Sequence, residues 1–215
     1  MKKLYIVGAG GLGREVLNLF LEIKSKEYKF ESFLDIENAS TTIGSSSYKI
    51  KSEEEFFESA NFAEIAIIVA IGDPIVLQKI VNKYKNLGVQ DFPNLIHPNT
   101  HISASAKLGQ GNIICNSSIL SIDVTMGNFN IINLNCTIGH DVKMENFNII
   151  NPGCNLSGSL SIGSNNLFGT NCTVLQNLEI GNKSIIGAGS MVNKSVENSV
   201  TLVGNPSRVM RKNIN

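Results

Sequence analysis

Three histidines, four cysteines and a glycine-rich turn are the groups in this 215-residue chain that could carry chemistry. His140 follows the apolar Ile138 by two residues, on a predicted turn where its side chain can point outward. A neutral imidazole titrates near physiological pH and can accept a proton from a reacting group. His97 and His101 lie in a junction between two sequence patterns, and we interpret both as structural. A lone histidine is more often structural than catalytic, so the pattern alone leaves both roles open for His140.

The cysteines could be offered as a metal site. Three of them recur at a spacing of eighteen residues, as Cys136, Cys154 and Cys172, without a short C-x-x-C pair and without interleaved histidines. Zinc sites normally use such close pairs. We therefore expect a ladder of small, buried, reduced side chains with no metal. Because no signal peptide precedes them, we also expect a cytoplasmic protein.

A period of six residues predicts the element that carries His140. This period fits neither a helix nor one long strand, but it fits short strands wound into a left-handed parallel β-helix. Glycine often follows the apolar residue, as at Gly139 and Gly163, where we expect turn backbone that a Cβ would hinder. The apolar positions are Ile102, Leu108, Ile114, Leu120, Met126, Ile132, Ile138, Met144, Ile150, Leu156, Ile162, Phe168, Val174, Ile180, Ile186 and Val192.

Residues four places after each apolar position repeat every eighteen residues, which predicts a three-faced coil of eighteen residues. Asparagine amides can satisfy one another along such a stack, so a polar residue is tolerated at an inward-leaning position. One face stacks Val124, Val142, Leu160, Leu178 and Val196; a second stacks Asn112, Asn130, Asn148 and Asn166; a third stacks Ser118, Cys136, Cys154, Cys172 and Ser190.

The first hundred residues alternate strands and helices instead. We predict strands over 3–7, 31–34 and 64–70 and helices over 15–23 and 75–84. This pattern is typical of a Rossmann-like half domain. The chain is thus predicted to hold an α/β domain over 1–97 and an all-β left-handed β-helix of hexapeptide repeats over 98–215.

The glycine turn after the first strand is typical of phosphate binding. Gly8 would permit the tight turn, Gly10 and Gly11 would let backbone N–H groups approach an anion, and Gly13 would pack helix against strand. Taken alone the motif is weak, and a tight turn without a ligand remains an alternative. The domain lacks a second mononucleotide half for NAD, so a nucleotide sugar fits better.

Acidic residues follow two of the predicted strands. Asp35 ends the second strand, where it is placed to meet a ribose or base, and Gly72 and Asp73 follow the third.

Eighteen basic residues balance eighteen acidic ones, which argues against a nucleic-acid or anionic-membrane partner. Apolar runs such as 65–71 are too short to span a bilayer.

Four motifs together resemble the bacterial sugar acyltransferases, among them sialic acid O-acetyltransferases and nucleotide-linked 4-amino-sugar N-acetyltransferases. The motifs are GAGGLGREV near the N-terminus, HPNTHISASAKLG at the junction, INLNCTIGHD within the hexads and GNPSRVMRK after them. The resemblance covers nearly the whole chain. It implies a homotrimer that binds acetyl-CoA between adjacent β-helices and a nucleotide sugar on the N-terminal domain.

The resemblance also implies roles for individual residues. His140 would be the general base for acyl transfer, and Asp141 would orient its ring and stabilise the imidazolium. Asn133 matches a position near the acceptor sugar, although a turn asparagine in a left-handed conformation is an equal alternative. Gly169, Thr170, Gly187 and Ala188 would line the pantetheine arm, while Arg208, Arg211 and Lys212 would meet the phosphates of acetyl-CoA unless they form only a solvated tail.

Three positions depart from the family pattern. Relatives often carry a second histidine nine residues after the first, where this chain has Ile149, so an oxyanion would be stabilised by backbone N–H groups or water. Leu12 stands where relatives often have a histidine, and Leu77 where they often have an arginine. We therefore expect the nucleotide preference to differ from that of well-known members.

The leading functional hypothesis is N-acetylation of a nucleotide-linked amino sugar, most simply a UDP sugar, in glycan synthesis. The rival is O-acetylation of a sialic or related nonulosonic acid by the same base. A non-catalytic nucleotide-sugar-binding trimer, a serine or other small-molecule acetyltransferase and an NAD enzyme are further alternatives. A small-molecule acetyltransferase would leave the N-terminal domain without a task, and an NAD enzyme would need cofactor binding that half a dinucleotide fold should not give.

Overall fold

The computed structural model describes residues 1–36, 39–59 and 61–212. Its contacts divide the chain into two compact units. One consists of Met1–Gly72 with Val76–Leu95, and the other of Asp73–Ile75 with Ile96–Asn215. The fold class predicted from the sequence, an α/β domain followed by a left-handed β-helix, is confirmed.

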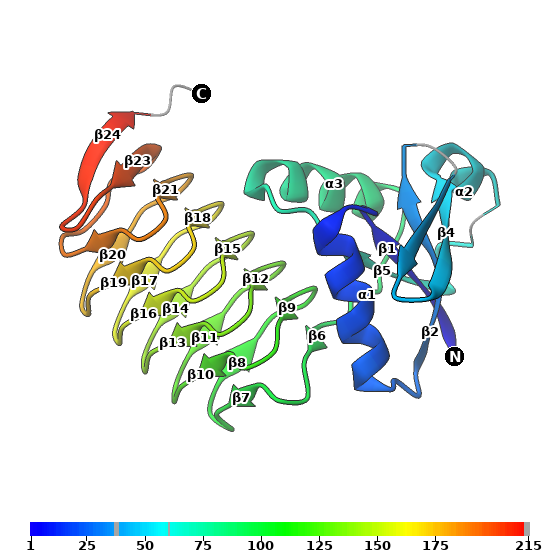
Figure 1. The fold of residues 1–215 in the computed structure, drawn as a ribbon, viewed down its shortest axis with the longest axis horizontal. Helices are drawn as coiled ribbons and strands as arrows, with labels where there is room; N and C mark the ends of the chain where they lie inside the picture. The colour runs from blue at the N-terminus through cyan, green and yellow to red at the C-terminus, as the bar shows by residue number, and fades with distance from the viewer. Residues whose placement is uncertain (37–38, 60, 213–215) are drawn as a thin grey trace. The chain divides into compact units, whose positions relative to one another are not determined.

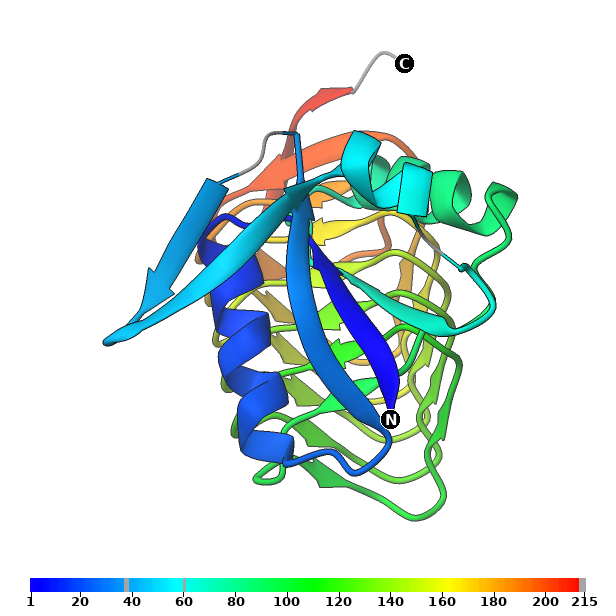
Figure 2. The same cartoon turned by 90° about the vertical axis from the view of Figure 1, so that its right-hand side faces the viewer.

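The first unit is built on a five-stranded sheet in the order β3-β4-β2-β1-β5, all parallel except the β3–β4 hairpin. Helix α1 runs alongside β1 and β2 (Figure 2). The elements are β1 (Lys2–Val7), α1 (Gly11–Ile23), β2 (Tyr28–Asp35), β3 (Ala39–Ile43), β4 (Ser46–Ser52), α2 (Glu53–Ser59), β5 (Ile65–Val69) and α3 (Pro74–Asn86).

The predicted strands and helices of this unit are confirmed, with longer bounds except for β5, which is one residue shorter at each end than predicted. Helix α1 buries Val16, Leu17 and Phe20 at helical spacing, and β5 is buried along its whole length. A ring cluster of Tyr5, Phe56 and Tyr84 fills the core. The β3–β4 hairpin is absent from the prediction, because its serine- and threonine-rich strands have no apolar periodicity. Helix α2 is absent too, because its seven residues are too few to show a helical period.

The second unit is a stack of two-residue strands that forms three parallel sheets (Figure 1). In each of the strands from β7 to β22 the second residue is the apolar residue of the predicted hexad. The β7 sheet contains β7 (His101–Ile102), β10 (Ile119–Leu120), β13 (Thr137–Ile138), β16 (Asn155–Leu156), β19 (Thr173–Val174) and β22 (Met191–Val192).

The other two faces repeat this arrangement. The β8 sheet contains β8 (Lys107–Leu108), β11 (Thr125–Met126), β14 (Lys143–Met144), β17 (Ser161–Ile162) and β20 (Glu179–Ile180). The β9 sheet contains β6 (Leu95–Ile96), β9 (Ile113–Ile114), β12 (Ile131–Ile132), β15 (Ile149–Ile150), β18 (Leu167–Phe168), β21 (Ile185–Ile186), β23 (Val200–Val203) and the antiparallel β24 (Arg208–Lys212).

The three predicted ladders lie inside the coil, but in the turn just before each strand rather than on the flat faces. In the asparagine ladder, the backbone N–H and the amide of Asn130 donate to Asn112 Oδ1 at 2.9 and 3.2 Å, and Asn148 bonds Asn130 in the same way. All four asparagines are fully buried. The amides therefore satisfy one another along the stack, as predicted.

The cysteine ladder is confirmed as a set of buried free thiols. Cys172 Sγ lies 3.5 Å from Cys154 Sγ, and the Cys136 thiol donates to the carbonyl of Asn151 at 3.2 Å. The hydrogen bond with Cys154 and burial together raise the pKa of Cys136 far above its usual range, so its thiol stays protonated. Across the described ranges, no three His, Cys, Asp or Glu side chains group as metal ligands.

The glycines after the hexad residues have a different cause from the one predicted. The left-handed turn positions are occupied by other residues, such as Asn135 and Asp141 with φ of 56° and 59°. A Cβ at Gly169 would instead lie 2.5 Å from the backbone nitrogen of Ala188 in the next coil. Close approach of successive coils, not turn conformation, requires glycine there.

No helix in the described part of the chain is long and apolar enough to span a membrane.

Candidate active site

His140 and Asp141 form the corner between β13 of the β7 sheet and β14 of the β8 sheet. Asp141 takes the left-handed conformation and donates its N–H to the carbonyl of Ile122 in the preceding coil at 3.1 Å. The carbonyl of His140 accepts from the N–H of Ser159 in the next coil at 2.7 Å. Backbone bonds to both neighbouring coils therefore fix this corner.

The two side chains meet at this corner. His140 Nδ1 lies 2.8 Å from Asp141 Oδ2, and both side chains are more than half exposed, at 59% and 58%. With an ionised Asp141, Nδ1 carries the proton and Nε2 is left as an acceptor. The arrangement suits a general base that is oriented by a carboxylate and open to a substrate.

The other predicted β-helix residues lie at a different corner, between the β9 and β7 sheets. Asn133 follows β12, Gly169 and Thr170 follow β18, and Gly187 and Ala188 follow β21. The width of the β7 sheet separates this corner from His140. The Asn133 side chain accepts from the N–H of Leu134 at 2.8 Å, as a turn asparagine does. Within one chain, these residues are not brought beside the imidazole.

The three basic residues near the C-terminus belong to a strand rather than to a loose tail. Arg208, Arg211 and Lys212 lie on β24, which pairs antiparallel with β23. Lys212 Nζ lies 3.6 Å from Glu197 Oε2, with both side chains nearly four-fifths exposed, and Arg211 Nε donates to Thr201 Oγ1 at 3.5 Å. Weak, solvated partners leave these cations able to meet an anion.

The glycine turn of the first unit borders a pocket of about 520 Å³ lined by Gly8, Asp35, Ile71, Lys79 and Lys83, among others. Gly8 has φ of 96°, which favours glycine, and a Cβ at Gly13 would collide with the Gly8 carbonyl. Gly10 caps α1 without a side-chain bond, which leaves N–H groups of the first turn available to an anion.

Asp35 is already engaged in the structure. Its Oδ2 accepts from the N–H of Ala9 at 2.9 Å and its Oδ1 from the N–H of Ile36 at 2.8 Å. The carboxylate therefore braces the glycine turn, and its predicted contact with a ribose would use its remaining lone pairs. Gly72 is exposed beyond β5, and Asp73 Oδ1 accepts from the N–H of Ile75 at the start of α3.

The pocket also contains a cation that sequence reasoning missed. Lys83 Nζ is bound to Glu53 Oε2 at 2.7 Å, whereas Lys79 has no ion-pair partner among the residues that the structure describes. Leu77, the departure from the family arginine, is buried at 1% exposure and contributes no charge. The helical spacing of Lys79 and Lys83 could have revealed that both lie on one face of α3.

Comparisons with known proteins found a matching N-terminal domain family and similar structures. The family model of the PglD N-terminal domain matches residues 3–84. The acetyltransferase domain of PglB from Neisseria gonorrhoeae FA1090 is 27% identical, with a TM-score of 0.88 over 98% of this chain and 100% of that chain. The chain is thus similar along almost its whole length to an acetyltransferase of known structure.

Two further structures resemble this chain along almost its whole length. WeeI from Acinetobacter baumannii AYE is 28% identical, with a TM-score of 0.87 and coverage of 98% of this chain and 100% of that chain. PerB from Caulobacter crescentus is 24% identical, with a TM-score of 0.89 and coverage of 98% of both chains, and shows the shared fold. No curated protein sequence matches this chain.

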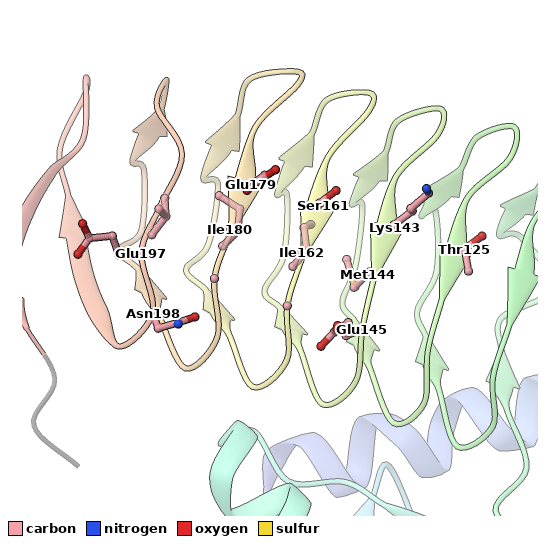
Figure 3. A pocket seen from close by; sticks show the side chains of 13 residues that line it. Thr125, Lys143, Met144, Glu145, Ser161, Ile162, Glu179, Ile180, Glu197 and Asn198 are labelled. Atoms are coloured by element: carbon pink, nitrogen blue, oxygen red, sulfur yellow. The ribbon is translucent and has the colours of Figure 1, made fainter.

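A groove crosses the β8 sheet, and none of the predicted site residues line it. Its volume is about 710 Å³, and the side chains of Thr125, Lys143, Ser161 and Glu179 follow one another across successive strands (Figure 3). Glu145, Glu179 and Glu197 give the groove more negative than positive charge. This surface is therefore poorly suited to the phosphates of a nucleotide or of coenzyme A.

Proposed function

We propose that this acetyltransferase transfers an acetyl group from acetyl-CoA to the amino group of a nucleotide-linked amino sugar, most simply a UDP sugar. The observation that carries the proposal is the His140–Asp141 pair, held at 2.8 Å on an exposed corner. The PglB acetyltransferase domain, at 28% identity, has been solved in complex with acetyl coenzyme A. PerB of the same fold has been solved with CoA and GDP-perosamine.

His140 would act through its free Nε2. The amine attacks the thioester carbonyl and forms the amide C–N bond, while Nε2 takes the proton that the nitrogen loses. The bond between the carbonyl carbon and sulfur breaks, and the resulting imidazolium can return the proton to the departing thiolate. Asp141 stabilises the imidazolium between these two transfers. Ile149, 2% exposed on β15, supplies no hydrogen bond to this step, so backbone N–H groups or water stabilise the oxyanion.

A homotrimer would complete the site. Gly169, Thr170, Gly187 and Ala188 lie across the β7 sheet from His140, so a pantetheine arm along their corner would reach the imidazole of a second copy, not of its own. Large apolar side chains are exposed on and beside this sheet, with Ile119, Ile122 and Leu134 at 44%, 56% and 44%. We expect light scattering to give the mass of three chains, and a monomeric mass would contradict this site.

In the first unit, the nucleotide would occupy the pocket beside Gly8, with its diphosphate near the N-terminus of α1 and Lys79. Replacing Lys79 by glutamine is expected to raise KM for the nucleotide sugar about tenfold without changing kcat, because the lost charged hydrogen bond is to a phosphate that takes no part in the reaction. Steady-state kinetics with varied nucleotide sugar measure this.

Lys85→Gln is the matched control for that variant. It removes the same charge from the same helix, but Lys85 is not among the residues that line the pocket. Equal effects of the two substitutions would indicate long-range charge rather than contact with the phosphates.

The function is tested by thiol release from acetyl-CoA with UDP-linked 4-amino sugars and free sialic acid as separate acceptors. Turnover with the amino sugar, and a product that resists mild alkaline hydrolysis, would establish N-acetylation. A product that alkali cleaves would be an ester and would assign O-acetylation instead. Nucleotide-sugar binding without turnover of any acceptor would contradict the enzymatic proposal.

A further inference from the structure

Gly158 lies directly beneath the imidazole of His140. It follows β16 by two residues and is one coil, eighteen residues, after His140. A Cβ at this position would lie 2.5 Å from His140 Nε2, 2.6 Å from Cε1 and 2.9 Å from Cδ2. The three nearest atoms thus all belong to one ring, and each is far inside the ordinary contact distance.

At Gly139 and Gly163, by contrast, a Cβ would also meet the backbone of the next coil. A Cβ at Gly139 would meet the nitrogen of Gly158 at 2.6 Å and the carbonyl carbon of Ser157 at 2.7 Å. At Gly163 it would meet the Asn182 side chain at 2.6 Å and the Gly181 carbonyl oxygen at 2.9 Å. At these positions a side chain would force two coils apart, whereas at Gly158 it would displace only the imidazole.

The backbone of Gly158 does not itself require glycine. The left-handed position of this turn belongs to the next residue, Ser159, with φ of 58°. Ser159 also donates its N–H to the His140 carbonyl at 2.7 Å. This turn therefore holds the His140 backbone through Ser159, and the missing side chain of Gly158 makes room for the ring.

We propose that Gly158 is a positioning residue for the base, an inference that rests on the proposed role of His140. The imidazole occupies the space that a Cβ of residue 158 would fill. In this position Nδ1 reaches Asp141 while Nε2 remains free. A methyl group at this position would push the ring by about 1 Å to restore van der Waals contact. A displacement of that size at a reacting atom can cost on the order of 100-fold in rate.

Gly158→Ala tests this proposal. We expect kcat to fall about 10- to 100-fold with KM for both substrates within about twofold, because the shifted group acts on the transition state and not on binding. The thermal midpoint of unfolding should stay that of the wild type, since the half-exposed ring yields rather than the coil. Gly163→Ala, whose Cβ would meet the Gly181 carbonyl oxygen as well as the Asn182 side chain, should instead lower that midpoint.

A double variant separates positioning from a structural role. In a His140→Ala background, adding Gly158→Ala should cause no further loss of kcat, because no ring remains to be displaced. A further loss there, or a lowered midpoint for Gly158→Ala alone, would overturn the inference. So would an unchanged kcat for Gly158→Ala if His140→Ala is inactive, and the proposed function would then still stand. If His140→Ala is also fully active, the proposed function itself fails.

Discussion

Replacing His140 by alanine is expected to lower kcat by about 10²- to 10⁴-fold, the usual contribution of a general base. The side chain is 59% exposed and contacts Asp141 through one 2.8 Å hydrogen bond, so its loss leaves no core cavity. We therefore expect the unfolding midpoint and the affinity for acetyl-CoA to change little. Thiol release from acetyl-CoA measures the rate, and calorimetric titration measures the affinity.

His101→Ala provides the matched control. His101 is also an exposed histidine, and it lies on β7 of the same sheet, two coils before the β13 strand that precedes His140. Its replacement should leave kcat unchanged. If His140→Ala kept the wild-type kcat, or if both variants lost activity equally, His140 would not be the base.

The largest expected loss of stability follows from replacing Asn148 by alanine in the middle of the buried ladder. Asn148 Oδ1 accepts the N–H and the side-chain amide of Asn166, both at 3.0 Å, and its own amide donates to Asn130 Oδ1 at 3.1 Å. Alanine would leave the polar groups of Asn166 short of partners where no water can replace them. We expect the free energy of unfolding to fall by about 2–4 kcal/mol, from at least one buried unpaired group and a small cavity.

Asn182→Ala separates burial from hydrogen bonding in this prediction. Asn182 belongs to a second row of stacked asparagines, and its Oδ1 accepts from the N–H of Ser164 at 2.7 Å, but the side chain is exposed. Water can take over its bonds, so we expect a loss below about 1 kcal/mol. Urea unfolding of both variants measures the difference. Equal losses would show that the contribution of the inward asparagines to stability does not depend on their burial.

The sequence predicts the β-helix well because its six-residue period corresponds to one face of a coil and its eighteen-residue period to one whole coil. Each apolar hexad residue becomes the inward residue of a two-residue strand, and the ladders at eighteen-residue spacing need no long-range information. In the N-terminal unit, β1 and β5 were predictable because each contains a short, uninterrupted run of apolar residues. The β3–β4 hairpin was not, since its polar strands depend on pairing with β2 rather than on their own pattern.

The candidate site was likewise predictable from the sequence only in part. His140 and Asp141 are adjacent in sequence, so their contact follows from local geometry once a turn is predicted. The bond between Asp35 and the Ala9 N–H joins residues twenty-six apart and depends on how β2 lies beside β1. Gly158 could have been found from the eighteen-residue coil, but only by asking what the next coil presents to the ring of His140. The ligand roles assigned to the glycine turn, to Asn133 and to the corner at Gly169 remain predictions.

The antiparallel β24 has a consequence for how the stack ends. A repeating coil exposes unpaired backbone groups on its last strand, which could recruit another chain and extend the solenoid into a fibre. By folding back on β23, β24 occupies that edge of the β9 sheet and presents Arg208, Arg211 and Lys212 along the new one. Like charges repel a second copy of the same edge. We therefore expect these three cations to disfavour edge-to-edge association of the stack, whether or not they also meet an anionic ligand.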